Sequence, residues 1–190
     1  MKSLLPLITL LFCFSCENDK GSNEKQKSTK QKISKEIPAP SYSEIEKKNP
    51  ETGDPTIIQT CIWGNYKFIT TGNPDFQGRY SYEYEVYKIT DKNEIKINNS
   101  DIFNSRINEL EKLINDELAK EIRKYREDPD DSDCLSQLGN PYFSINEMGI
   151  TIIPGNKMEF RVTFGLGGAC MNVDGASASF SLNQIKNYIR

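Results

Sequence analysis

Residues 78–90 read GRYSYEYEVYKIT, and the alternation in this stretch decides how we expect the chain to fold. Aromatic and polar side chains follow each other with a period of two, which predicts a β-strand with two different faces. One face would carry Tyr80, Tyr82, Tyr84 and Val86, and the other would carry Ser81, Glu83 and Glu85.

Further strands are expected on both sides of this segment. Residues 56–70, TIIQTCIWGNYKFIT, are rich in β-branched and aromatic side chains. Gly64 and Asn65 interrupt them, so they predict either one bent strand or two short ones. Residues 94–98, EIKIN, follow a DKN turn and predict another short strand.

The period then changes to three or four residues, which predicts an amphipathic helix of about six turns. The apolar positions that follow this spacing are Phe103, Ile107, Leu110, Ile114, Leu118, Ile122 and Tyr125. The helix would begin between Ser100 and Asn104, where Ser, Asp and Asn are all suitable N-caps. Pro129 would end it.

The last part of the chain returns to strand-like sequence. The segments YFSIN, ITII, MEFRVTF and ASASF are separated by turn residues, and Ser181 would cap a short helix, LNQIKNYI. Strands grouped on either side of one helix indicate an α+β fold. We therefore expect residues 55–190 to form a single α+β domain, in which an antiparallel sheet of hairpins packs against one long amphipathic helix and a short C-terminal helix follows.

The N-terminus predicts export. Residues 4–14 form an apolar stretch of 11 residues, which suits a secretory signal and is too short to span a bilayer. It ends at Ser15-Cys16 and then turns polar, which resembles a bacterial lipoprotein signal. The resemblance implies that residues 1–15 are cleaved and that Cys16 carries acyl chains such as palmitate, which bury in a lipid bilayer. The alternative is an ordinary cleaved signal with an incidental cysteine.

Residues 16–54 are dominated by Lys, Glu, Ser, Asn and Pro. Such a segment buries too little apolar surface to offset the entropy of ordering, so we expect a disordered tether behind the lipidated cysteine. A charged helix over residues 28–37 is the other interpretation. With either a disordered tether or a helix, the lipid anchor would hold the domain at the bacterial cell envelope. We expect the periplasmic or the outer face of the outer membrane.

Composition narrows the function further. The formal net charge is −3, which disfavours non-specific binding to nucleic acid. The chain has no histidine, which excludes Ser-His-Asp and Cys-His catalysis and the usual histidine-containing zinc sites. We expect no metal and no cofactor, and a catalytic role is less favoured than a binding role.

Three cysteines follow the signal. An exported chain meets an oxidising compartment, so we expect one disulfide and one cysteine left over. Cys134 and Cys170 both lie in loop-like sequence, whereas Cys61 lies in a predicted strand. We therefore favour a Cys134–Cys170 bond, although all three pairings are possible.

The segments YFSINEMGITI and GASASFSLNQIKNYI, with the predicted long helix before them, resemble the end of the RsiV-like domain of bacterial envelope lipoproteins. The matching residues are Phe143, Ile145, Gly149, Ile150, Gly175, Phe180, Leu182 and Ile185. The resemblance implies an α+β fold and, from the anti-sigma member of the family, sensing by binding lysozyme. It supplies no catalytic residues.

Two segments are candidates for binding. Tyr80, Tyr82 and Tyr84 would either stack on a sugar or protein partner or pack as core beneath the long helix. The long loop GLGGACMNVDG, residues 165–175, is a candidate recognition surface with Leu166, Asn172 and Asp174.

The sequence thus favours a lipid-anchored envelope protein with a non-catalytic binding domain for an envelope protein, such as a lysozyme-like enzyme, or for a glycan. An alternative is a carboxylate-based hydrolase acting on cell-wall sugars, with Glu83 and Glu85 about 7 Å apart on one strand face. A third interpretation is an immunity-type inhibitor displayed on the surface.

Overall fold

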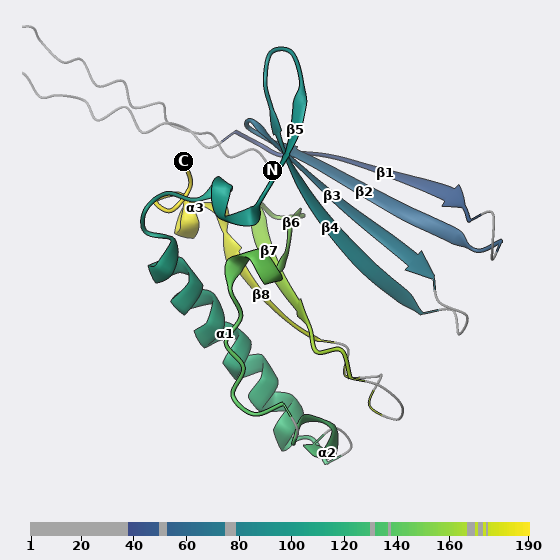
Figure 1. Cartoon of the computed structure of the whole chain (residues 1–190), viewed down its shortest axis with the longest axis vertical. Helices are drawn as coiled ribbons and strands as arrows, with labels where there is room; N and C mark the ends of the chain where they lie inside the picture. The colour runs from purple at the N-terminus through teal and green to yellow at the C-terminus, as the bar shows by residue number, and fades with distance from the viewer. Residues whose placement is uncertain are drawn as a thin grey trace, which may run out of the picture. The chain divides into compact units, whose positions relative to one another are not determined.

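The computed structural model describes residues 38–49, 53–74, 79–129, 132–136, 138–166, 170, 173 and 175–190. They belong to one compact unit, Glu36–Arg190. The expected signal peptide, Cys16 and the tether as far as residue 37 lie outside the described residues. Among the described residues, two antiparallel sheets and a few helices, one of them long, make up an α+β fold, as predicted (Figure 1).

The first sheet has five strands in the order β1-β2-β3-β4-β5, so each strand pairs with its neighbour in sequence. Residues 56–70 contribute to two separate strands, because Gly64 turns the chain with φ of +57°. Glycine takes this left-handed conformation without the steric cost that a side chain brings. The strands are β1 (Ser41–Lys48), β2 (Pro55–Trp63), β3 (Tyr66–Pro74), β4 (Tyr80–Ile89) and β5 (Glu94–Ile97).

Strand β1 corrects the expected boundary of the tether. Residues 41–48, assigned to the tether from their composition, pair with β2 along their whole length, from Ser41 opposite Ile62 to Lys48 opposite Pro55. All eight residues of β1 are exposed, so the strand has no pattern of buried apolar residues from which the sequence could predict it. Its order comes from the backbone hydrogen bonds that β2 offers along its edge.

The long helix α1 (Ile107–Glu127) begins later than the sequence predicts. A short 3-10 helix, η1 (Asn99–Ile102), occupies the segment where the start was expected. Phe103, expected on the helix, has an extended backbone and forms a β-bridge with Ile189. The end is close to the prediction, because Asp128 is the C-cap residue and the residue before a proline disfavours helical geometry.

After α1 and a short helix, α2 (Ser132–Leu135), the chain builds a second sheet of three strands in the order β6-β7-β8. The terminal helix is only four residues long, and the Ser181 hydroxyl caps it by accepting a hydrogen bond from the Gln184 amide, as expected. The remaining elements are η2 (Ile145–Glu147), β6 (Gly149–Ile153), β7 (Lys157–Thr163), β8 (Gly175–Ser181) and α3 (Leu182–Ile185).

Helix α1 packs on the second sheet, which differs from the expectation of one sheet beneath the helix. It contacts β8, and Figure 1 shows it lying alongside β7 and β8. Its apolar stripe faces inward, with Leu110, Ile114 and Leu118 almost fully buried. Every second residue of β7 is buried, and these residues, Met158, Phe160 and Val162, form the apolar face against which such a stripe packs.

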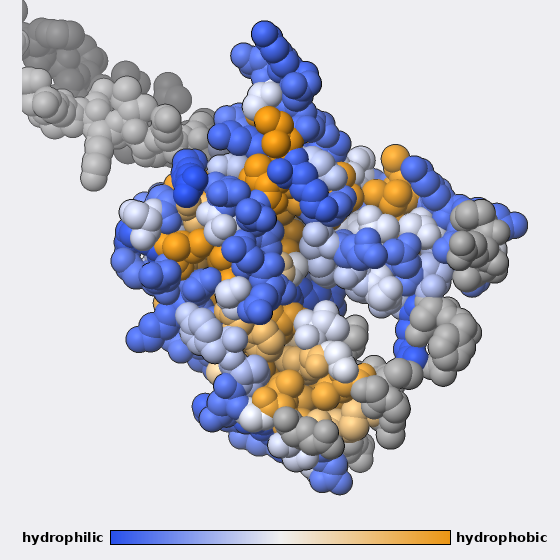
Figure 2. Space-filling model, viewed as in Figure 1, coloured by the Kyte–Doolittle hydropathy of each residue, from blue (hydrophilic) through white to orange (hydrophobic). Residues whose placement is uncertain are grey.

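One hydrophobic core joins the two sheets. The first sheet contributes Cys61, Trp63, Phe68 and Val86, which lie at the end of the sheet nearest η1 and the second sheet. Figure 2 shows one face of the molecule, on which hydrophilic residues predominate and apolar residues gather near α1 and toward α2. The other end of the first sheet contributes little to the core, so its inward-facing side chains are available for other roles.

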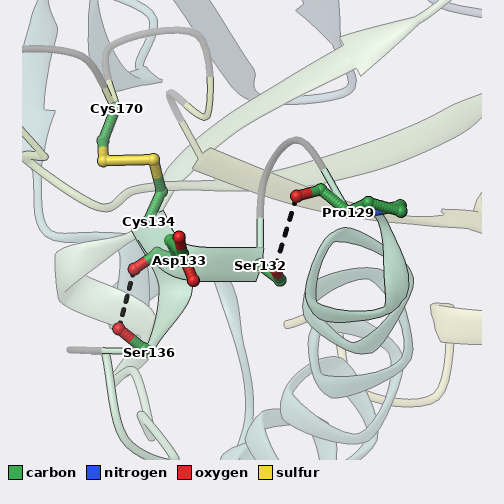
Figure 3. Close-up of a disulfide and its surroundings, with 6 residues drawn as sticks. All are labelled: Pro129, Ser132, Asp133, Cys134, Ser136 and Cys170. Atoms are coloured by element: carbon green, nitrogen blue, oxygen red, sulfur yellow. Dashed lines mark hydrogen bonds between the residues drawn. A yellow bond between two sulfur atoms is a disulfide. The ribbon is translucent and has the colours of Figure 1, made fainter.

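Cys134 of α2 and Cys170 form a disulfide, which is the pairing that the sequence favoured (Figure 3). Cys61 is a free and buried cysteine. Around the disulfide, the Ser136 hydroxyl donates to the Asp133 carbonyl over 2.7 Å. The Cys134–Cys170 disulfide connects the loop after β7 to the short helix α2, which follows α1 (Figure 3).

Candidate functional site

Two faces of the first sheet differ sharply, and the candidate site begins with the one that holds Phe68 and Tyr84, here called the inner face. The strand register aligns Gln59, Thr70 and Tyr84 in one row across β2, β3 and β4. The next row outward contains Ile57, Gly72 and Tyr82. Because side chains alternate along a strand, these residues share a face with the core residues but extend beyond the core.

The second sheet presents its polar face toward this row. Along β7, Phe160 and Val162 are buried on the side of α1, whereas Glu159 and Arg161 point to the opposite side. Arg161 pairs with Gly149 of β6. The polar face of one sheet and the outer part of the inner face of the other therefore lie across a space that polar side chains line together with the apolar Ile57, Ile152 and Pro154.

This space is the inter-sheet cleft, which consists of two adjoining cavities. The first has a volume of about 440 Å³, which is within the usual range for small-ligand pockets. The second has a volume of about 340 Å³ and reaches Glu121 and Tyr125 of α1. Tyr82, Tyr84 and Arg161 line both cavities, so these three side chains form the wall that the cavities share.

Arg161 is the only cationic side chain among the described residues that line the cleft. Its guanidinium carbon lies 5.4 Å from the centroid of the Tyr82 ring, a cation–π distance. Its side chain also hydrogen-bonds to Tyr84. Within the part of the chain that the structure describes, no carboxylate lies within 4.0 Å of its nitrogens, so aromatic groups hold it in place of an ion pair.

Tyr84 reaches its position because β6 begins with a glycine. A Cβ atom on Gly149 would lie 2.2 Å from Cδ2 of Tyr84 and 2.6 Å from its Cγ, closer than atoms in contact can come. The bare backbone therefore lets the ring lie against β6. Burial raises the pKa of the Tyr84 hydroxyl, although Arg161 opposes the shift, so the phenol stays neutral and remains a hydrogen-bond donor at neutral pH.

Tyr82 presents an exposed aromatic ring in the cleft, with 43% of the residue's surface accessible. It lies over Gly72, whose added Cβ would come within 3.0 Å of the ring. Tyr80 stacks beside it with ring centroids 6.4 Å apart and donates a hydrogen bond to the Pro55 carbonyl over 3.1 Å. Tyr80 therefore supports Tyr82 from outside the cleft and does not line it.

Thr70 lines the larger cavity in an unusual state. The residue is only 5% exposed, and its hydroxyl has no hydrogen-bond partner among the described residues. Buried hydroxyls are nearly always hydrogen-bonded, so each exception calls for an explanation. Cys61 lies on the same wall, and burial raises the pKa of its thiol to about 11, so it remains an unreactive thiol at neutral pH.

Strand β1 covers one side of the larger cavity. The Tyr42 hydroxyl donates to the Ile153 carbonyl over 2.9 Å and so connects β1 to β6 across the cleft. Glu44 accepts a hydrogen bond from the Gln59 side chain over 2.9 Å. The segment assigned to the tether from the sequence therefore contributes side chains to the site.

The structure distinguishes among the predicted binding residues. Tyr80, Tyr82 and Tyr84 lie on one face of β4, and Tyr82 and Tyr84 line the inter-sheet cleft, so these two belong neither to the apolar core beneath α1 nor to a flat outer surface. Leu166 is half-buried and packs against the core, which makes it a structural residue. Asn172 and Asp174 lie outside the described residues.

The two glutamates of the hydrolase interpretation lie away from the cleft. Glu83 and Glu85 alternate with the cleft tyrosines along β4 and therefore point to the outer face. A hydrogen bond from Lys96 lowers the pKa of Glu85, and one from Tyr87 lowers it further. A carboxylate held ionised in this way is poorly suited to donate the proton that glycoside cleavage requires.

Arg161, Thr70 and Gly149 were not identified as site residues from the sequence. The alternation in MEFRVTF does place Arg161 opposite the apolar side chains of that strand, which is a usable signal for one polar face. Nothing in the sequence indicates that this face would meet β3 and β4. The pairing of two sheets across a cleft is a tertiary property that no local pattern records.

Among the described residues, no helix combines the length and the apolar character needed to cross a bilayer. No protein-family model matches this sequence, and the searches of curated proteins and of solved structures likewise find no match.

Proposed function

We propose that this chain is a non-catalytic, lipid-anchored binding protein of the bacterial cell envelope, and that its inter-sheet cleft binds a glycan. The observation that carries the proposal is the shared wall of the two cavities, where the exposed ring of Tyr82 lies beside Arg161 and Tyr84. The predicted acyl chains on Cys16 would keep the cleft close to envelope polymers. The resemblance to RsiV-like envelope lipoproteins agrees with a binding role.

The groups in the cleft suit a carbohydrate. A sugar ring has an apolar face, which packs on a flat aromatic ring, and hydroxyls, which need both donors and acceptors. Tyr82 offers the ring, Arg161 and Tyr84 offer donors, and Glu159 offers an acceptor. The larger cavity also contains the Thr70 hydroxyl, which has no partner among the described residues and can both donate and accept.

The proposal favours binding over hydrolysis in the cleft. Glycosidases need two carboxyl groups facing each other across the sugar, one of them held protonated. The carboxylates that line the larger cavity are Glu44 and Glu159, and Glu44 already accepts a hydrogen bond from Gln59. Glu85, the better sequence candidate, is kept ionised by Lys96 on the outer face.

The first test measures glycan binding by the full chain. Isothermal titration with soluble oligosaccharides, including the N-acetylglucosamine tetramer and uronic acid oligomers, should give saturable binding. Tyr82→Ala should weaken it at least tenfold, because the stacking ring is lost. Tyr87→Ala is the matched control, since Tyr87 lies on the same strand but binds Glu85 on the outer face. Binding that is absent, or that depends equally on both tyrosines, would refute the proposal.

The second test concerns the anchor. Mass spectrometry of the chain purified from bacterial membranes should show acyl chains on Cys16 and no residues before it. Cys16→Ser should release the chain from the membrane fraction. An unmodified Cys16 in membrane-associated protein would contradict the anchoring part of the proposal and leave the cleft's binding role to be judged by the first test.

A further inference from the structure

We infer that the glycan held by the inter-sheet cleft carries a carboxylate, which Arg161 binds, so that the chain prefers acidic over neutral sugars. The inference rests on the proposed function and goes beyond it, because it names the substituent that the ligand must carry. It follows from the state of Arg161, from the geometry of its neighbours and from the distribution of charge around it.

Arg161 has no carboxylate within 4.0 Å among the described residues, and it is the one basic side chain of this kind that lines the cleft. Five other basic residues lie within 3 Å of a carboxylate oxygen, in the pairs Lys67–Glu94, Lys96–Glu85, Arg106–Glu109, Lys120–Glu117 and Lys124–Glu121. Those pairs are on the surface, where they contribute little stability. Arg161 is exposed as well, but it lies at the wall that the two cavities share, where a ligand in either cavity can reach its guanidinium.

The neighbours of Arg161 orient it for such a partner. The Tyr82 ring lies 5.4 Å from the guanidinium carbon, and Tyr84 takes one hydrogen bond. A guanidinium has five N–H donors in a planar fork, so most of them remain for a ligand. The fork matches the two oxygens of a carboxylate, and a side chain that is already held loses less entropy on binding.

Three carboxylates line the cavities, and Glu159 interacts electrostatically with Arg161, but none of them lies within ion-pair distance of its guanidinium. Glu44 accepts from Gln59, and Glu121 of the smaller cavity is paired with Lys124 over 2.8 Å. Glu159 lies two residues from Arg161 on the same face of β7, beyond ion-pair distance from it. It can therefore accept hydrogen bonds from sugar hydroxyls while Arg161 holds the carboxylate.

Because the whole chain is negatively charged, a preference for acidic sugars would indicate a local cationic group in the binding site. The formal net charge is −3, so long-range attraction works against an anionic ligand. A chain with this charge binds an acidic sugar more tightly than its neutral form only through a local cationic group. In the cleft, Arg161 is the one cationic group that the described residues supply.

The experiment compares two probes that differ only in charge, tetragalacturonate and its methyl ester, by isothermal titration with the full chain. The acid should bind about 10- to 100-fold more tightly than the ester, the range expected for a charge-assisted hydrogen-bonded pair. Arg161→Gln should remove this preference, so that the acid and the ester bind with affinities within about threefold of each other. Arg161→Lys should keep part of the preference, because it keeps the charge and loses the planar fork.

Lys157→Gln is the matched control, because Lys157 is exposed on the same face of β7 and lines neither cavity. It removes the same unit of charge and should keep the preference intact. Unchanged thermal unfolding midpoints would show that the variants are folded.

The outcomes separate this inference from the proposed function. Equal binding of acid and ester, with both dependent on Tyr82, would overturn the carboxylate preference and support the glycan site. A preference that survives Arg161→Gln, or that Lys157→Gln abolishes equally, would overturn the role of Arg161. Binding of neither probe, and of no neutral oligosaccharide, would overturn both.

Discussion

Gly149→Ala tests how the cleft is built, because a single methyl group would enter space that the Tyr84 ring occupies. The added Cβ would lie 2.2, 2.5 and 2.6 Å from three ring atoms, whereas carbon atoms in contact are about 3.5–4.0 Å apart. The ring would therefore have to move by more than 1 Å, and it lies between β6 and the Arg161 side chain.

The expected cost follows from two opposing contributions. Overpacking of this kind costs about 1–3 kcal/mol. Replacing glycine by alanine lowers the entropy of the unfolded chain and so returns about 0.4–1 kcal/mol, because Gly149 is not among the glycines with positive φ. We expect the free energy of unfolding to fall by about 1–2 kcal/mol, which corresponds to a decrease of about 2–8 °C in Tm for a unit of this size.

A double-mutant cycle measured by urea unfolding isolates the clash. In a Tyr84→Ala background the ring is gone, so Gly149→Ala should be neutral or slightly stabilising. Glycan affinity should also fall in Gly149→Ala, because Tyr84 is displaced from the cleft. If Gly149→Ala costs the same free energy in both backgrounds, the close approach of the ring does not explain the glycine, and the reasoning is refuted.

Three further predictions concern Thr70, Cys61 and the Cys134–Cys170 disulfide. Thr70→Val should raise the free energy of unfolding by about 1 kcal/mol, because it removes a buried hydroxyl that has no partner among the described residues. Thr71→Val, on the other face of β3, is the control and should change the free energy of unfolding by less than about 0.5 kcal/mol. A clear loss of stability in Thr70→Val would contradict this reasoning. The rate of Cys61 alkylation in the folded protein should rise about tenfold per pH unit from pH 8 to 10, because a pKa of about 11 keeps the thiolate scarce. In the unfolded chain the alkylation rate should level off above about pH 9. Identical pH profiles for the two states would refute the pKa shift. Reduction of the disulfide between Cys134 and Cys170, which are 36 residues apart, should lower the free energy of unfolding by about 3–4 kcal/mol. The measurement is urea unfolding with and without reductant. An unchanged unfolding midpoint would show that the disulfide does not constrain the unfolded chain.

Periodicity in the sequence was enough to predict most of the secondary structure. The alternation from Tyr80 to Val86 reflects a strand with two different faces, and the stripe from Leu110 to Ile122 reflects burial on one side of a helix, so each predicted its element correctly. Strand β1 escaped prediction because none of its side chains is buried. The start of α1 was wrong because Phe103 has the apolar spacing of a helix but is buried through a β-bridge.

The candidate site was predicted only in part. Tyr82 and Tyr84 were identified because aromatic side chains on an alternating strand are conspicuous. Their partner, Arg161, lies on another sheet, and the sequence gives no information about which faces meet. Gly149 was named only among the residues that match the RsiV-like domain, and its role in the structure depends on the ring of Tyr84, which is distant in sequence.

Strand β1 has a consequence for how copies of this protein behave toward each other. Without it, β2 would offer an unpaired backbone edge whose sequence, PTIIQTCIW, combines β-branched and aromatic residues with no charge. Such segments readily add strands from neighbouring molecules and seed aggregates. The strand that takes this place carries Glu44, Glu46, Lys47 and Lys48, and such charges discourage further lateral pairing. A polar segment that adds almost nothing to the core therefore covers an apolar strand edge with a charged one, which lowers the tendency of this edge to aggregate.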